Sequence, residues 1–296
     1  MRIMSMKGLA VAVALLTASC SNASNNANSA TAHGTIPVVT TFSTLNSFAQ
    51  AVGGDRVTIR NLVPIGASPE DYQPSPQDVA TLSDGRLLIE NGTGIETWLQ
   101  HTIQNAQNPT LRVLVLSQGL PHVDTNPHLW MDPVLARAYT DKVRDALSAV
   151  DPSHRAAYAA NAAVYRKKLA ALQQSIARQI ATIPPSHRTM IVFHNAWQYY
   201  NNRFGIRTIG VIELSPGQEP NPQYIAHLVD LAKRYQVRAV FAEPEYSPKL
   251  AQTLARSAGI RTVTNLYDDS ISSDPRVHDY ISMLQYDTNV IVQALK

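Results

Sequence analysis

The sequence predicts an α/β protein with two lobes, each built on a parallel four-stranded sheet, joined by one long linking helix. Two observations predict the lobes: short β-branched or aliphatic runs alternate with helical stretches from residue 36 onward, and the second half repeats the plan of the first. A third, an uninterrupted helical stripe between the halves, predicts the link. Because parallel sheets are covered by helices on both faces, this alternation indicates Rossmann-like lobes.

Four strand-like runs are expected in each half. They cover residues 36–42, 57–63, 87–91 and 112–117, then 190–193, 208–214, 237–242 and 262–267. Helical stretches separate them at residues 44–52, 76–84, 94–105, 195–204, 222–235 and 248–258. Asp132, Asn221 and Ser247 each stand before a proline, which is typical of a capped helix start.

The helical stripe between the halves runs from Asp151 to Ile183. Its apolar positions step by three, four and seven residues, and Pro184-Pro185 ends it. Such a helix would reach roughly 45 Å, longer than one lobe needs, so we expect a strut between lobes; the alternative is a helix packed on one lobe. The predicted boundaries are an N-terminal lobe at 35–150, the linking helix at 151–185 and a C-terminal lobe at 186–296.

The N-terminus has the pattern of an export signal. Two positive charges precede an apolar run over residues 8–16, which is only about half of the ~20 residues that a bilayer needs. Residues 1–19 are therefore expected to be a secretory signal peptide. Cys20, the only cysteine, ends a segment that resembles a bacterial lipobox, except that Thr17 stands where an aliphatic residue is usual. An ordinary signal peptide cut nearby is the alternative.

Residues 20–34 are small and polar without apolar periodicity, which predicts a flexible, lipidated tether. The protein is then exported to the periplasm or cell surface and held at the membrane by a lipid anchor on Cys20. A net charge of +3, with no basic cluster interleaved with aromatics, gives no support for a nucleic-acid partner.

Four potential metal ligands follow strand-like runs: Glu70, His128, His194 and Asp269. The carboxyl ends of parallel strands face one crevice, where ligands bind. Two donors come from each half, so together they predict a closed cage for one divalent transition metal. Taken singly, each has a plainer interpretation as a solvated carboxylate, a structural histidine or a helix cap.

The motifs around these donors resemble those of a known family. They are Gly66 to Pro74 (Gly-x-x-Pro-x-x-Tyr-x-Pro), Asn126 to Trp130, Phe193-His194, Phe241 to Pro244 and Tyr267 to Ser270. In this order they are similar to the cluster A-I substrate-binding lipoproteins of zinc and manganese ABC importers, over about residues 36–296. The resemblance implies a protein that captures a divalent ion between two lobes and delivers it to a membrane permease.

The resemblance also implies the ligand set of Glu70, His128, His194 and Asp269. Glu70 departs from the family, which usually has histidine there; glutamate remains a competent donor. Glu243, at another strand end, is the reserve ligand or, preferably, a partner of a ligand. Two imidazoles with two carboxylates favour manganese or iron, whereas intrinsic affinity favours zinc over manganese. The short segment from Ser117 to Thr125 lacks the His-rich loop of many zinc importers.

Two other functions compete with transport. A metal-dependent hydrolase would keep one coordination position open for water, and the sequence has no Gly-x-Ser-x-Gly motif; we therefore expect no enzyme. A surface lipoprotein acting as an adhesin, with a structural metal, is the second alternative.

Overall fold

The computed structural model describes residue 1 and residues 34–215 and 217–296. The predicted signal peptide, Cys20 and nearly all of the predicted tether lie outside the described residues. Residues 35–296 form one compact unit. Among the helices in the described part of the chain, none is long and apolar enough to cross a membrane.

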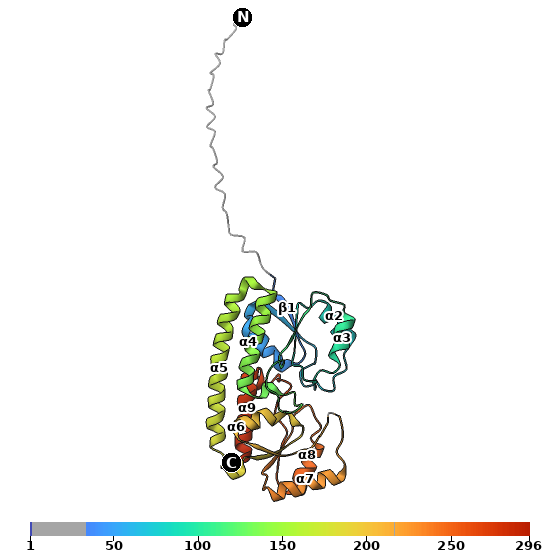
Figure 1. Cartoon of the computed structure of the whole chain (residues 1–296), viewed down its shortest axis with the longest axis vertical. Coiled ribbons are helices and arrows are strands. Elements are labelled where there is room, and N and C mark those ends of the chain that lie inside the picture. Colours follow the sequence, from blue (N-terminus) through green and yellow to red (C-terminus); the bar gives the residue numbers. More distant parts are fainter. Residues whose placement is uncertain (2–33, 216) are drawn as a thin grey trace. The chain divides into compact units, whose positions relative to one another are not determined.

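Two parallel four-stranded sheets form the framework, as predicted (Figure 1). The first contains β1 (Ile36–Thr40), β2 (Val57–Asn61), β3 (Leu87–Glu90) and β4 (Arg112–Val115), in the order β2-β1-β3-β4. The second contains β5 (Thr189–Val192), β6 (Arg207–Val211), β7 (Ala239–Phe241) and β8 (Arg261–Val263), in the order β6-β5-β7-β8. Strand order reverses beside β1 and beside β5, so each sheet has a crevice for ligands at its carboxyl edge.

Nine α-helices lie within the described residues. They are α1 (Ser43–Gly53), α2 (Pro76–Ser83), α3 (Leu99–Ala106), α4 (Pro133–Val150), α5 (Arg155–Ala181), α6 (Gln198–Phe204), α7 (Pro222–Arg234), α8 (Lys249–Ala258) and α9 (Tyr280–Leu295). The caps at Asp132 and Asn221 are confirmed, since their side chains accept from Val134 N and Tyr224 N. The predicted cap at Ser247 is wrong, because α8 begins at Lys249 after Pro248. Helix α9 was not predicted.

Helix α5 is the predicted linking helix. Its 27 residues extend over roughly 40 Å, and its buried stripe contains the expected Tyr158, Tyr165, Leu169, Leu172, Ile176 and Ile180. It packs against α1 and α4, which adjoin the first sheet, and against α9 from the C-terminal part of the chain (Figure 1). The helix therefore touches structure on both sides of the molecule.

The largest cluster of buried apolar side chains is shared by both lobes. Phe48 on α1 is fully buried, and its ring contacts those of Tyr139 on α4, Tyr165 on α5 and Tyr280 on α9, with centroids 4.9–6.1 Å apart. Rotating one lobe away from the other would separate these rings and expose apolar surface. Changes at a site between the lobes are therefore expected to be local movements of loops.

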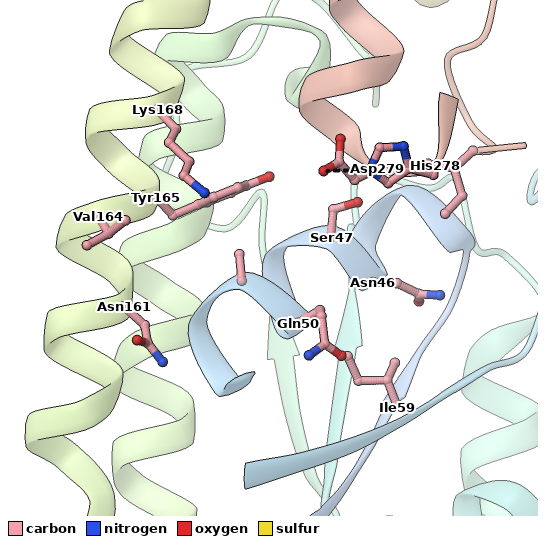
Figure 2. A pocket seen from close by; sticks show the side chains of 12 residues that line it. Asn46, Ser47, Gln50, Ile59, Asn161, Val164, Tyr165, Lys168, His278 and Asp279 are labelled. Carbon is pink, nitrogen blue, oxygen red and sulfur yellow. Dashed lines mark ion pairs between the residues drawn. The ribbon is translucent and has the colours of Figure 1, made fainter. Parts of the chain in front are cut away.

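A cavity of about 530 Å³ lies where α1, α5 and the segment before α9 meet (Figure 2). Tyr165 projects from α5 toward Ser47 and Asp279, and Lys168 lies one turn further along α5. The cavity does not contain any of the four predicted metal ligands.

Candidate metal centre

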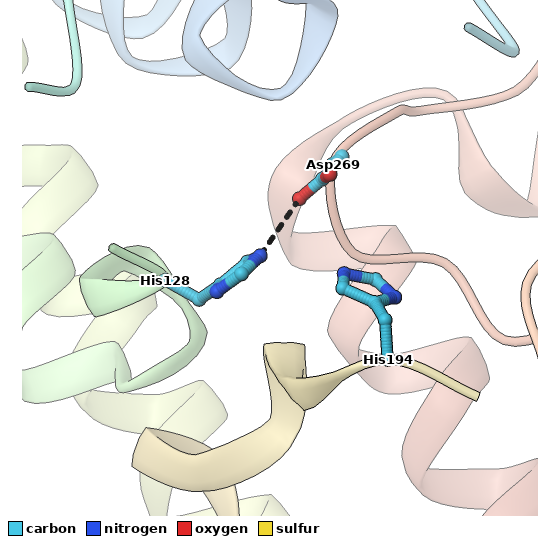
Figure 3. A group of neighbouring side chains, drawn as sticks. All are labelled: His128, His194 and Asp269. Carbon is cyan, nitrogen blue, oxygen red and sulfur yellow. Dashed lines mark ion pairs between the residues drawn. The ribbon is translucent and has the colours of Figure 1, made fainter. Parts of the chain in front are cut away.

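Three of the predicted donors meet in one place, as Figure 3 shows. One ligand atom from each of His128, His194 and Asp269 lies within 4.8 Å of the others. His128 precedes a short 3-10 turn at Leu129–Met131, His194 stands two residues after β5, and Asp269 lies in the segment that follows β8. The sequence therefore brings donors from both lobes to one point.

The separations between donors fit a metal ion. His128 Nε2 lies 3.5 Å from Asp269 Oδ1 and 3.8 Å from Glu70 Oε1. Donors bound at ~2.1 Å in a tetrahedral site lie about 3.4 Å apart. Glu70 thus lies near His128. It is not within 4.8 Å of all three of His128, His194 and Asp269, so it is not part of their group.

The ring of His128 is oriented by Asn126. The Asn126 side-chain oxygen accepts from His128 N at 3.0 Å, and its amide nitrogen donates to Asn195 O at 2.6 Å. With the amide fixed in this way, His128 Nδ1, also 3.0 Å from that oxygen, is the donor. Nε2 then carries no hydrogen, and its lone pair faces the cluster. This is the tautomer that a metal ligand needs.

The ring of His194 is oriented by Glu243. His194 Nδ1 lies 3.4 Å from Glu243 Oε2, and the other carboxylate oxygen accepts from Trp197 Nε1 at 3.2 Å. Glu243 is 1% exposed and belongs with Asp268 and His194 to a second group of donors within 4.8 Å. Glu243 is not in the group of His128, His194 and Asp269, and its contact with His194 Nδ1 is of the kind that orients a ligand.

Buried donor atoms without hydrogen-bond partners gather at this site. Within the described residues, His128 Nε2, His194 Nε2, both carboxylate oxygens of Asp269 and Asp268 Oδ2 are buried and make no hydrogen bond. Leaving one buried polar atom unpaired costs about 1–3 kcal/mol. So many in one place indicate that the site is built for a cation.

The pKa values of the two histidines shift in opposite directions. Burial, with the neighbouring His194, lowers the pKa of His128 well below its ordinary value of 6.5. Burial also acts to lower the pKa of His194, but the carboxylates of Asp268 and Glu243 outweigh it and raise that pKa well above 6.5. Burial raises the pKa of Asp269 and of Glu70, and the charge of His194 opposes it in both cases.

The segment that carries Asp269 is held by a hydroxyl, an indole and a backbone amide from the N-terminal lobe. Thr44 Oγ1, on α1, donates to Asp269 O at 2.9 Å and lies 3.2 Å from Asp268 O, which also accepts from Trp130 Nε1 at 3.0 Å. Ser270 Oγ accepts from Gly66 N at 2.8 Å. Gly66 has φ of 83°, a left-handed conformation that favours glycine. These bonds fix a C-terminal donor against N-terminal structure.

The loop that carries Glu70 is held more lightly. Trp98 Nε1 donates to Pro69 O at 2.8 Å, and Glu70 N donates to Ser68 Oγ at 3.2 Å. The Glu70 side chain is 13% exposed, compared with 3% for His128 and 2% for Asp269. A cavity of about 280 Å³, lined also by Glu213 and Tyr246, lies over Glu70, His128 and His194 and gives access to the cluster.

Several residues of the site were missed by sequence reasoning. Asp268 lies beside His194 and Asn126 beside His128, while Trp197 donates to Glu243 and Thr44 to the backbone of Asp269. Asp268 and Asp269 are adjacent acids after one strand, so the pattern could not tell which of them faces His128. Asn126 lies within a recognised motif, but its role depends on contacts that only the fold supplies.

The donor cluster and two α/β lobes define a metal-binding protein, and comparisons with known proteins identify its family. The family described as Zinc-uptake complex component A periplasmic (ZnuA) matches residues 38–294. The manganese-binding lipoprotein MntA of Halalkalibacterium halodurans is 31% identical over 96% of this chain and 95% of its own. The iron-binding protein YfeA of Yersinia pestis is 28% identical over 87% and 85%.

A crystal structure of ZnuA has the same fold, with a TM-score of 0.81 and 27% identity over 88% of this chain and all of the other. The chain belongs to the ZnuA family of metal-uptake components. It is therefore a binding protein for transport and not an enzyme, which confirms the predicted class.

Proposed function

We propose that this protein captures one divalent transition metal ion with Glu70, His128, His194 and Asp269 and delivers it to the permease of an ABC importer. The gathering of unpaired buried donors around His128 and His194 is the observation that carries the proposal. Relatives named as substrate-binding lipoproteins of manganese ABC transporters support the importer as the partner.

Manganese or ferrous iron is the proposed cargo, with zinc as a competitor. Two imidazole and two carboxylate donors form a harder set than one dominated by histidine. Glu70, 3.8 Å from His128, and Asp269, 3.5 Å from it, supply the oxygen donors. A relative named for manganese and another named for iron support this choice.

Export and lipid anchoring through Cys20 belong to the same proposal. The pattern of residues 1–20 supports them, as do relatives whose names include the word lipoprotein. The proposal keeps an N-terminal lobe at residues 35–150, a linking helix at 151–185 and a C-terminal lobe at 186–296.

The test is equilibrium metal binding to protein stripped with a chelator. Isothermal titration with manganese, with zinc, and with ferrous iron under anaerobic conditions should give one ion per chain. Competition between the metals should then rank their affinities. Circular dichroism before and after stripping distinguishes cargo from a structural metal. Protein that binds no divalent ion while remaining folded, or that unfolds when stripped, contradicts the proposal.

A further inference from the structure

Helix α5 has an unusual charge content. The whole chain balances 25 basic against 22 acidic residues. Over α5, however, the basic residues Arg155, Arg166, Lys167, Lys168 and Arg178 are accompanied by no acidic residue. Every one of these five side chains is exposed. The metal cluster is acidic and buried, so charge is strongly separated within residues 35–296.

Alanines occupy most of the remaining exposed positions of α5, together with Gln174 and Val164. Ala156, Ala159, Ala160, Ala163 and Ala171 are exposed and lie between the basic positions. Val164, 55% exposed, and Lys168 project from the flank of α5 that borders the cavity in Figure 2. Between the alanines, the flexible Lys and Arg side chains can extend toward a partner of opposite charge.

Most of this charge is not neutralised within the described part of the chain. Asp141 on α4 pairs with Arg166 and with Arg144, the latter at 2.9 Å, and Asp145 pairs with Arg144. By contrast, Lys167, Lys168, Arg155 and Arg178 make no ion pair with a described residue. Arg137, Arg144, Arg166 and Lys167 border a groove of about 590 Å³ between α4 and α5.

The compact unit also begins beside this helix. Thr35 precedes β1, which pairs with β2 from Val57 onward. Just before β2, a side chain at Gly54 would meet Asn161 of α5 at 3.4 Å, and Asn161 Nδ2 donates to Val52 O at 3.0 Å. The first residues of the body therefore lie on the side of the first sheet that adjoins the N-terminal half of α5.

We propose that the exposed basic face of α5 is a docking surface for an anionic phospholipid bilayer. Exposed Lys and Arg within a Debye length of an anionic membrane each strengthen binding about fivefold. The face has the positive charge that such contact needs, and α5 itself carries no acidic side chain. The contact is separate from metal binding, since no proposed metal ligand lies on α5.

The experiment uses residues 35–296, which contain the whole described core and lack the proposed anchor. Binding is measured by co-sedimentation with vesicles of phosphatidylcholine alone and of phosphatidylcholine with phosphatidylglycerol, at low and physiological ionic strength. The protein should bind only the vesicles with phosphatidylglycerol, and salt should weaken the binding.

Two triple variants locate the contact. Replacing Lys167, Lys168 and Arg178 by Gln should weaken vesicle binding about 100-fold at low salt. The matched control replaces Lys233, Lys249 and Arg256, which are exposed on α7 and α8, and should change binding less than twofold. Manganese titration should be unaffected in both variants, which separates this proposal from the proposed transport function.

Three results would overturn the proposal. The first is no binding to anionic vesicles at low salt. The second is an equal loss of vesicle binding in both triple variants, which would indicate that the net charge of the protein, and not the α5 face, causes the binding. The third is tighter binding of polyglutamate or duplex DNA than of anionic vesicles, since the surface would then serve an acidic polymer.

Discussion

In the C-terminal lobe His194 stands two residues after the end of β5, whereas in the N-terminal lobe Glu70 stands nine residues after the end of β2. The first donor is held by the sheet and by a buried carboxylate that an indole fixes in turn. The second lies on a proline-rich loop, where Trp98 holds the backbone of Pro69 but the Glu70 side chain itself is 13% exposed. The two lobes have the same strand order, but the His194 side chain is fixed by side-chain contacts and the Glu70 side chain is partly exposed.

A binding protein whose lobes share one core must release its cargo by a local movement at the site. Phe48 and its three aromatic neighbours oppose separation of the lobes. None of these four rings lies on the loop that carries Glu70, so a local movement of Glu70 does not require them to separate. We therefore expect His194 and His128 to determine affinity and Glu70 to determine the rate of release.

The largest effect should come from the firmly held donors. His194→Ala or His128→Ala should weaken manganese affinity by more than 100-fold, because even partners of ligands contribute about 10–100-fold. Isothermal titration measures the affinity, and circular dichroism checks that each variant folds. Unchanged affinity in either folded variant would remove that histidine from the site.

The free energy of unfolding should depend on pH through one buried carboxyl group in the N-terminal lobe. Burial raises the pKa of Glu96 from 4.5 to about 7, so the folded state binds a proton more tightly than the unfolded chain does. This contribution is fully present below pH 4.5 and is lost as the pH rises toward 7. The loss is about 3 kcal/mol.

Urea unfolding of wild type and of Glu96→Gln at pH 5 and pH 8 measures this term. The stability of the wild type should fall with pH relative to that of the variant. Parallel changes in the two proteins would mean that the Glu96 carboxyl does not titrate in this range. The carboxylate accepts from Asn91 N at 2.8 Å and Gly92 N at 3.0 Å, so a lower starting stability of the variant is also expected.

Removing the partner of His194 should have the next largest effect. Glu243→Gln should weaken manganese affinity by about 10–100-fold, because the His194 ring would lose the carboxylate that orients it. Trp197→Phe removes only the indole donor to Glu243 and should cost less. An effect of Glu243→Gln as large as that of His194→Ala would instead indicate that Glu243 binds the ion itself.

Glu70→Gln should cost about tenfold in affinity, mainly through faster release. A chelator chase in a stopped-flow instrument measures that rate, and Asp71→Asn is the control because Asp71 is an exposed neighbour on the same loop. Glu70→His should shift the preference toward zinc, because imidazole suits zinc better than manganese. Equal release rates for Glu70→Gln and wild type would contradict the role given to this loop.

The smallest effect is expected at Thr44. Thr44→Val keeps the shape but removes the hydroxyl that donates to Asp269 O, and the loss of one hydrogen bond is worth about 1 kcal/mol. Manganese affinity should fall about fivefold while the unfolding midpoint changes little. Ser83→Ala, on the surface of α2, is the control and should leave affinity unchanged.

Much of the fold was predictable because its signals are local. Short aliphatic runs predicted all eight strands, although β8 ends at Val263 and not at Tyr267, since Thr264 to Tyr267 leave the sheet to approach the site. The stripe from Tyr158 to Ile180 predicted α5 because burial on one face imposes its spacing. Helix α9 was missed, since Asp287 and Thr288 interrupt its apolar face and are buried by tertiary contacts.

The site was predictable in its residue types but not in its geometry. Strand ends predicted that Glu70, His128, His194 and Asp269 would converge, and the structure brings three of them within 4.8 Å of each other, with Glu70 3.8 Å from His128. The orienting contacts of Asn126 and Trp197 join residues 46 to 69 positions apart. No local pattern encodes such pairs, so only the folded chain reveals them.

Anomalous X-ray diffraction from crystals grown with manganese would locate the bound ion and identify its ligands. We predict one strong peak in the cavity between the lobes, about 2.0–2.3 Å from His128 Nε2, His194 Nε2 and carboxylate oxygens of Asp269 and Glu70. A peak bound by other residues, or no peak at that position in protein that has taken up manganese, would contradict it.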